Sequence, residues 1–339
     1  MNSTPKKRIL GIPNRYYVLL FLVLLFISAR IVPPILPHVQ LPAEAYSTEP
    51  LFVGPVIGPF YWTNTMTAML LADLVLILLA LTVRRVVNKG GLVPKGITGA
   101  VEAILEAIHN LTETTAGKWT KSIFPFFATI TLLVLVVNWM ELIPGVDSIG
   151  VLHEAKEGQH GYSKQEIAPG IYIIVEPEEG EAQEHEGEGT EGLYVLVPFV
   201  RVLSTDLNFT VGLALISVIM TQVMGVRSLG PGYFTKFLNV KGFFSRPIFG
   251  LIDFGVGLLE LISEFSKILS FSFRLFGNIF AGSVLLFVMG TLLPIIQSGF
   301  LMLEFFVGLI QALVFGMLTM VFMSQATAGH GGHQDEHAH

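Results

Sequence analysis

The chain has 339 residues, of which 52% are hydrophobic and only 14% are charged, and its formal net charge at pH 7 is −6. A soluble chain carries about a quarter charged residues, so this composition excludes an ordinary soluble domain and is typical of a membrane protein. The chain has no cysteine, which excludes disulfides, thiolate catalysis and cysteine-based metal sites. Its basic residues cluster beside apolar segments, which is a topology signal, and we expect no nucleic-acid partner.

The first 62 residues form the first expected region. Four Lys and Arg residues lie within positions 6–15, and an apolar run follows at 16–29. This order is typical of a signal peptide or a signal anchor. The small-residue triplet at 43–45 lies too far past the run to be a convincing cleavage site, so we expect an uncleaved, slightly short span. A Pro-rich and aromatic external loop is expected up to residue 62.

Residues 63–146 contain two further apolar runs, at 67–83 and 124–143, which we expect to be membrane helices. Between them, apolar residues recur every three or four positions over 97–111, which predicts an amphipathic helix on the cytoplasmic surface. Asp73 lies within the first run. We expect it to face neighbouring helices or water, although a place in a proton path is the sharper alternative.

The external side is marked by polar residues. Asn138, Trp139 and Glu141 stand near the far end of the second run, where an aromatic and polar cluster suits a membrane interface. Residues 147–192 follow and are the least membrane-like part, with eight Glu and no Lys or Arg between 176 and 192. We expect a solvated, partly disordered loop, and a cation-collecting antenna is the functional alternative.

Residues 193–246 are expected to hold one more crossing, at 209–226. Asp206 or Asn208 stands just before this run and is expected to cap the helix. If there are six crossings, the basic groups at 6–15, 84–95 and 227–246 all fall on one side and the acidic loop on the other. The positive-inside rule then places both termini in the cytoplasm.

Residues 247–326 are expected to form a helical hairpin. The run at 247–290 is too long for one perpendicular crossing, because about 20 residues span the hydrocarbon. It must therefore tilt strongly, kink or lie partly in the membrane plane. Pro294 breaks the chain, and a second long apolar helix is predicted at 295–324. The His-rich tail at 327–339 is expected to be solvated, and we assign no metal site and no cofactor to the chain.

A polar file runs along each helix of this hairpin. Steps of three and four residues place side chains on one face of a helix. Arg274 stays protonated at any accessible pH, and at membrane depth such a charge costs about 2.5–3.5 kcal/mol, which marks it as a functional residue. The file on the first helix is Glu260, Ser263, Lys267, Ser270, Arg274 and Asn278, and the file on the second is Gln297, Glu304 and Gln311.

The segment SFRLFGNIFAG around Arg274 resembles the arginine motif of subunit a of F-type ATP synthases, the stator half of the proton channel. The resemblance extends from about residue 64 to residue 325. We therefore expect an all-α integral membrane protein with about six membrane helices, the last two a long, strongly tilted hairpin. The resemblance implies a place in the bacterial plasma membrane. The partners it implies are a rotor c-ring, the peripheral-stalk subunit b and the lipid bilayer.

The resemblance also implies residue roles, with no covalent chemistry on this chain. Arg274 matches the family's essential arginine, which separates two proton half-paths. Lys267 is expected to extend towards the cytoplasmic interface. The remaining matches are Glu260 with Ser263 and Ser270 for the cytoplasmic half-path, and Asn278, Glu304 and Gln311 for the external one.

Two positions depart from the family pattern. Many bacterial members carry His where this chain has Glu304, and an acidic residue or His where it has Ser283. A single carboxylate at Glu304 is expected to serve for both. The alternative function is a secondary transporter or cation channel with Glu304 and Asp73 as ligands, but such proteins show repeated halves, which we do not find. A purely structural scaffold would not need a permanent charge at membrane depth.

Overall fold

The computed structural model describes most of the membrane part of the chain. Four of the expected features lie outside the described residues: the first span at 16–29 except residue 23, the Glu-rich stretch at 176–192, the basic residues of 238–246 and the His-rich tail beyond 328. The described residues are 23, 43–47, 49–55, 58–88, 96–155, 161–175, 193–237, 247–292 and 294–328.

Long apolar helices make up the body of the molecule. Within the described part of the chain, five helical segments are long and apolar enough to cross a membrane. The expected fold class, a multi-pass all-α membrane protein, is thereby confirmed, while the expected first crossing falls outside the described part. The helices are α2 (Asn64–Asn88), α3 (Ile97–Ala116), α4 (Thr120–Met140), α6 (Leu207–Leu229), α8 (Pro247–Leu292) and α9 (Pro294–Thr327).

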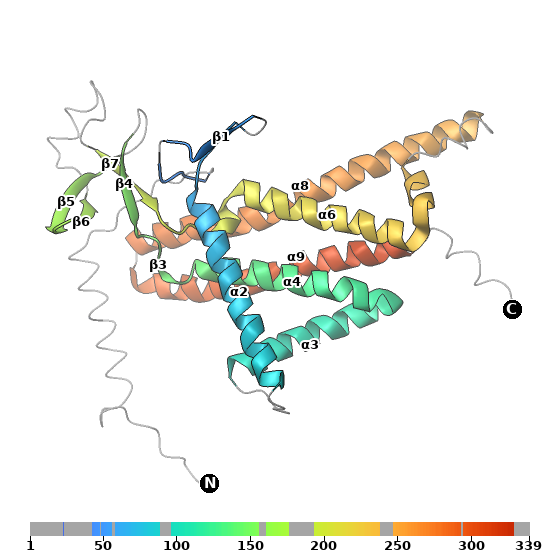
Figure 1. Ribbon diagram of the computed structural model, residues 1–339, viewed down its shortest axis with the longest axis horizontal. Helices are drawn as coiled ribbons and strands as arrows, with labels where there is room; N and C mark the ends of the chain where they lie inside the picture. Colours follow the sequence, from blue (N-terminus) through green and yellow to red (C-terminus); the bar gives the residue numbers. More distant parts are fainter. Residues whose placement is uncertain are drawn as a thin grey trace, which may run out of the picture.

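Four of these helices, α4, α6, α8 and α9, run side by side, and α2 crosses them steeply (Figure 1). Their shared core holds the fully buried Leu275 of α8 and Ala312 of α9. The rings of Phe271 and Phe315 join the same two helices with centroids 5.2 Å apart. The α8–α9 hairpin that the sequence predicts is therefore packed on its inner face by α4 and α6.

Small residues let two of the helices approach closely. A methyl group at Gly316 of α9 would overlap the hydroxyl of Thr131 and lie 2.8 Å from the ring of Phe127, both on α4. In a membrane, where no hydrophobic effect drives helices together, such close packing is a main source of association.

The amphipathic helix α3 turns back along α4. A short 3-10 turn, Gly117–Trp119, joins the two, and Gly117 has a φ of 49°, which favours glycine. The apolar stripe predicted from the sequence packs on α4 and α9, with Ile108 only 1% exposed. One face of α3 is thus committed to the helix bundle.

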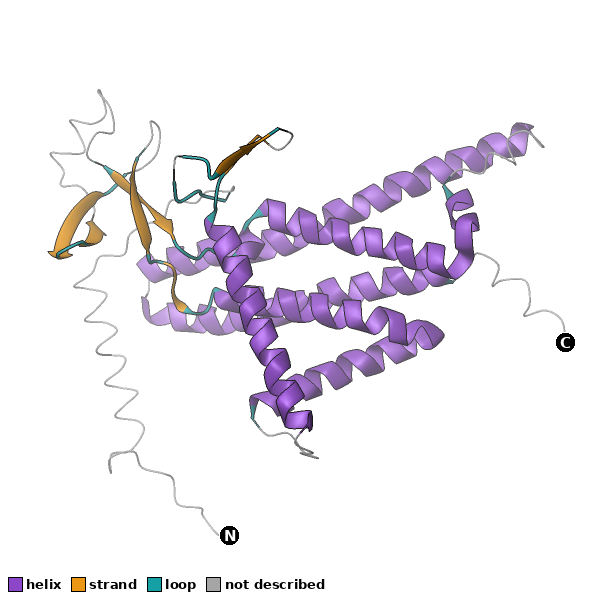
Figure 2. Ribbon diagram, viewed as in Figure 1, coloured by secondary structure: helices purple, strands orange, loops and turns teal. Residues whose placement is uncertain are grey.

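Short strands, which the sequence did not predict, occupy the ends of the loops. Six of the seven described strands form three antiparallel two-stranded sheets, β1–β2, β4–β7 and β5–β6. Most gather at the end of the molecule where α4 ends and α6 begins (Figure 2). The strands are β1 (Phe52–Gly54), β2 (Gly58–Phe60), β3 (Pro144–Asp147), β4 (Gly150–Glu154), β5 (Ser163–Ala168), β6 (Ile171–Val175) and β7 (Tyr194–Pro198).

The start of α6 is capped as the sequence predicted. Asp206 is the N-cap residue, and its Oδ1 accepts a hydrogen bond of 2.9 Å from the backbone N–H of Asn208. Such a cap satisfies one of the backbone donors left free in the first turn of a helix. Ahead of α6, a 3-10 turn, Leu203–Thr205, is fully buried against α4 and α8.

Candidate functional site

Arg274 lies on the face of α8 that points away from the bundle. Its neighbour Phe273 is 55% exposed, whereas Phe271 and Leu275 are buried in the core. Arg274 itself is exposed, and its Nη2 donates a hydrogen bond of 3.4 Å to Ser270 Oγ, one turn earlier. The guanidinium therefore stands on an apolar surface and remains available to a group from another chain.

The polar files of α8 and α9 face each other. The polar residues that recur every seven positions on α9 lie opposite small or polar residues of α8, and the two helices are antiparallel. The Asn278 side chain donates a hydrogen bond of 2.9 Å to Gln311 Oε1. In order along the hairpin, Gln297 contacts Gly290, Glu304 contacts Gly282 and Gln311 contacts Asn278.

Glu304 is buried at the middle of this register. It is 6% exposed, and a methyl group at Gly282 would overlap its carboxylate. Its Oε2 and the Nε2 of Gln311 have no hydrogen-bond partner among the described residues. Both residues line a groove of about 420 Å³, together with Asn278, Gly282 and the apolar residues Ala281, Leu285, Val307 and Ile310. Buried polar atoms normally have partners, so this groove is suited to water or to a partner's polar group.

A second carboxylate, Glu141, joins this region from α4. Ser283 of α8 donates a hydrogen bond to Glu141 Oε1. From the sequence, Glu141 is expected at a membrane interface, with no role in the site. Its contact with Ser283 joins residues 142 positions apart, and no spacing within one helix indicates such a contact.

The end of α4 is fixed against α9 within the turn of α9 that follows Glu304. Asn138 Nδ2 donates a hydrogen bond of 3.2 Å to the carbonyl of Gly308, and Trp139 Nε1 donates one of 3.1 Å to the carbonyl of Phe305. The rings of Trp139 and Phe305 stack with centroids 4.7 Å apart. These contacts hold Glu141, the next residue but one, in place.

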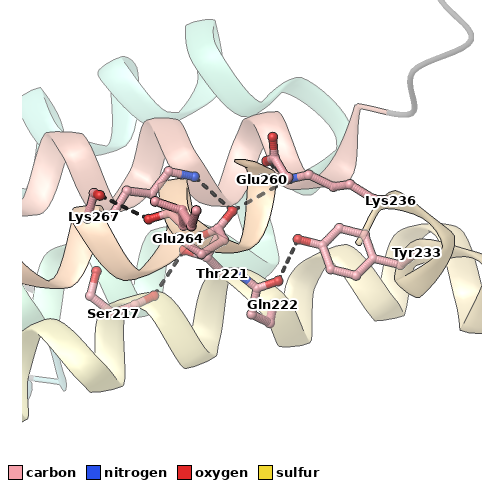
Figure 3. A network of polar contacts seen from close by, with 10 residues as sticks. Ser217, Thr221, Gln222, Tyr233, Lys236, Glu260, Glu264 and Lys267 are labelled. Carbon is pink, nitrogen blue, oxygen red and sulfur yellow. Dashed lines mark hydrogen bonds and ion pairs between the residues drawn. The ribbon is translucent and has the colours of Figure 1, made fainter. Parts of the chain in front are cut away.

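The other end of the α8 file is a cluster of charges (Figure 3). Glu260 Oε1 lies 2.5 Å from Lys236 Nζ, which comes from the 3-10 segment η3 (Gly230–Lys236). Lys267, which is expected to extend towards the cytoplasmic interface, has its Nζ 2.8 Å from Glu264 Oε1. The sequence pattern did not identify Lys236, because this residue belongs to another element. It did not identify Glu264 either, because the α8 file steps through Ser263, which Glu264 follows directly.

Some of the expected site residues are less buried than Glu304. Ser263 and Ser270 are exposed on α8. Asp73 is half-buried on α2, a helix that packs mainly against α4. In the part of the chain that the structure describes, no three His, Cys, Asp or Glu residues are grouped to hold a metal ion.

The arrangement separates two groups of polar side chains. With a rise of about 1.5 Å per residue, Glu260 lies about 21 Å before Arg274 along α8, and Gly282 about 12 Å after it. One group therefore contains Glu260, Glu264 and two lysines, and the other contains Glu304, Glu141 and their amide neighbours. Arg274 is the charged residue between them on α8.

A comparison with protein families agrees with this arrangement. The family model described as ATP synthase A chain matches residues 66–324. The match includes both polar groups and Arg274, and it begins just after the start of α2.

Proposed function

Because the chain belongs to the ATP synthase A chain family, which supplies subunit a of the proton-translocating Fo sector, we propose that it provides two proton half-channels against the rotor c-ring. In this proposal, protons move along one polar group, cross to a carboxylate of the ring, and leave along the other. The observation that carries the proposal is the separation of the two groups by the exposed Arg274.

Arg274 acts as the separator. A ring carboxylate that passes it is held ionised, because at about 4 Å and an effective dielectric near 20 two opposite charges attract by about 4 kcal/mol. The ring's rotation can break this attraction, and the membrane potential supplies about 2.3 kcal/mol per charge per 100 mV. The same fixed charge blocks a direct proton leak between the half-channels. The exposed apolar surface around Arg274, including Phe273, supports a ring contact there.

The cytoplasmic half-channel uses Glu260, with Ser263 and Ser270 between it and Arg274. Glu260 is about one-third exposed, so water can reach it. Water access is required, because an isolated carboxylate in hydrocarbon stays neutral and carries no proton flux.

The external half-channel uses Asn278, Glu304 and Gln311. The groove beside Glu304 and its unpartnered Oε2 support a proton-exchanging role for this carboxylate. The sequence predicts that Glu304 alone serves for the titratable group that many family members carry at the position of Ser283, and we propose instead that Glu141 supplies it. Its contact with Ser283 places a carboxylate at that point of α8 without changing α8 itself.

The remaining partners follow from the same proposal. The broadly exposed apolar residues of α2, such as Leu74 and Ile77, face the lipid bilayer or the peripheral-stalk subunit b. Both termini lie in the cytoplasm, and the protein resides in the bacterial plasma membrane. ATP chemistry takes place on other subunits, because this sequence contains no G-x-x-x-x-G-K-[ST] loop.

The test is ATP-driven acidification of inverted membrane vesicles that carry the assembled complex. Arg274→Ala should abolish pumping while the complex stays assembled. Arg227→Ala, which removes an exposed arginine at the end of α6, is the matched control and should pump normally. Normal pumping by Arg274→Ala would show that the separator role is wrong.

A further inference from the structure

One buried side-chain amide joins α4 to α9. Asn138 of α4 is 3% exposed, and its Nδ2 donates a hydrogen bond of 3.2 Å to the carbonyl of Gly308. Its Oδ1 accepts a hydrogen bond of 2.7 Å from the hydroxyl of Ser204, which is fully buried in the 3-10 turn η2 (Leu203–Thr205). Two helices and the turn ahead of α6 therefore meet at one side chain.

The partners of Asn138 fix the direction in which its amide points. A backbone carbonyl only accepts hydrogen bonds, so the amide nitrogen faces Gly308 and the amide oxygen faces Ser204. The Ser204 hydroxyl then donates to that oxygen. This hydroxyl holds the amide in the orientation that the bond to α9 requires.

The bond from Asn138 to α9 lies one helical turn from two carboxylates. Glu141 follows Asn138 by three positions, and Glu304 comes four positions before the residue of α9 that accepts the bond. The two helices are antiparallel, because the next residue of α4, Trp139, donates to an earlier carbonyl of α9, that of Phe305. Both carboxylates therefore lie on the same side of the bond, about 4.5 and 6 Å further along the helix axes.

The same two carboxylates contact consecutive residues of α8. Glu141 accepts a hydrogen bond from Ser283, and the carboxylate of Glu304 lies against Gly282. The contacts thus form a closed ring that passes from α9 through Asn138 to α4, from α4 to α8, and from α8 back to α9. A shift of α4 relative to α9 would change the position of both carboxylates relative to α8.

A glycine lets α4 and α9 approach closely enough for this bond. A methyl group at Gly308 would lie 3.2 Å from Cβ of Asn138 and 3.4 Å from Cδ1 of Trp139, which is tighter than ordinary van der Waals contact. The side chain of asparagine is short, so its amide reaches a helix carbonyl only at such a separation. The bond is consequently sensitive to the distance between the two helices.

We propose that Asn138 is a positioning residue that, oriented by Ser204, holds Glu304 and Glu141 in register between α4, α8 and α9. This inference deepens the proposed function and rests on Glu304 belonging to the external half-channel. Groups that exchange protons must lie within hydrogen-bond reach of each other or of one shared water, and a displacement of about 1 Å can slow a reaction about a hundredfold. Asn138 acts through this geometry, because its amide does not titrate.

The first experiment measures ATP-driven acidification of inverted vesicles, expressed per assembled complex. Asn138→Leu keeps the branched shape of the side chain but removes both hydrogen bonds, and the rate should fall about tenfold. Ser204→Ala removes only the group that orients the amide, and the rate should fall about threefold. Asn110→Leu, at an exposed asparagine of α3, is the matched control and should keep the wild-type rate. A purely structural role would lower the amount of complex and leave the rate per complex unchanged.

The second experiment replaces the hydrogen bond by a covalent one. The chain has no cysteine, and a Cβ at Gly308 would lie 3.2 Å from that of Asn138, just under the span of about 3.5–4.5 Å in disulfides. Asn138→Cys combined with Gly308→Cys should pump slowly when reduced, and oxidation to the disulfide should raise the rate at least about threefold. Each single cysteine variant should show no response to the oxidant.

The outcomes distinguish this inference from the proposed function. Slow pumping by Asn138→Leu and recovery of the oxidised pair support it. Normal pumping per complex by Asn138→Leu overturns it, and so does an oxidised pair that stays as slow as the reduced one. The cysteine pair alone decides if Asn138→Leu does not assemble. If the inference is overturned while Arg274→Ala still abolishes pumping, only the inference fails, whereas normal pumping by Arg274→Ala would refute the proposed function itself.

Discussion

Ser283 of α8 donates a hydrogen bond to Glu141, which lies 142 positions earlier in the chain. The contact brings the end of α4 to the α8–α9 hairpin at the level of Glu304. The carboxylate that Ser283 contacts therefore belongs to the residue directly after α4.

We expect Glu141→Gln to slow ATP-driven acidification about tenfold or more, because it removes a group that can exchange a proton. Ser283→Ala should slow it by about fivefold at most, because it removes one hydrogen bond worth about 1 kcal/mol. The initial rate in inverted vesicles is the measurement. Glu113→Gln, at an exposed carboxylate of α3, is the control. A normal rate in Glu141→Gln would remove this residue from the external half-channel.

Gly282→Ala should impair pumping without unfolding the protein. Its added methyl group would overlap the Glu304 carboxylate, which lies at the end of a flexible side chain and can move away. The displaced carboxylate would then leave its position beside Asn278 and Gln311. Gly212→Ala, on α6 with no atom within 4 Å of the added carbon, should leave the rate unchanged. Equal rates in the two variants would contradict the role given to Glu304.

Gly316→Ala should destabilise the bundle rather than the site. The new methyl group would overlap Thr131 and crowd the Phe127 ring on α4, and overpacking of this kind costs about 1–3 kcal/mol. Thermal unfolding of the purified full-length protein in detergent measures the effect. Gly299→Ala, on the same helix with open space around the added carbon, should retain the wild-type midpoint. The close α4–α9 contact would be in doubt if both variants melted together.

Asp147, in β3, should make the folded protein more stable as pH falls. Burial raises the pKa of its carboxyl from 3.8 to about 6, although Arg201 and a hydrogen bond from the Val202 N–H act in the opposite direction. The folded state then binds the proton more tightly than the unfolded state. Stability from this group is full below about pH 4 and is lost as pH rises to 6, by about 3 kcal/mol.

The variant Asp147→Asn isolates this group. Asparagine tolerates the positive φ of 60° at this position. The difference in melting temperature between wild type and variant should change in favour of wild type as the pH is lowered from 7 to 5. A difference that is constant over this range would show that Asp147 does not titrate there.

The membrane helices were predictable because a long apolar run leaves few alternatives. The run at 209–226 became Leu207–Leu229, and the run at 67–83 became Asn64–Asn88. The strands were not predictable in this way. In β5, Lys164 and Glu166 interrupt the apolar pattern, and the strand is defined by its pairing with β6. Two-stranded sheets depend on such cross-strand contacts more than on local preference.

In the candidate site, too, some contacts were predictable from the sequence and others were not. Periodicity alone put Asn278 and Gln311 on facing helices, and the structure joins them by a hydrogen bond. It could not find Lys236 or Glu141, because each reaches α8 from another element. Such contacts depend on how the elements pack, and the spacing of residues within α8 does not predict that packing. The functional roles of Glu260, Arg274 and Glu304 stay predictions until the variants are measured.

The pairing of β4 with β7 indicates where this chain can accept an inserted domain. The N–H of Ala155 bonds to the carbonyl of Leu193 at 2.9 Å, and the backbones of Tyr162 and Tyr194 pair beside them, so the segment between Ala155 and Leu193 starts and ends at one edge of this sheet. Doubling the length of such a loop costs only about 0.6 kcal/mol in closure entropy. The segment between Ala155 and Leu193 can therefore accept an affinity tag or a fluorescent domain, which would make the protein visible without disturbing its helices.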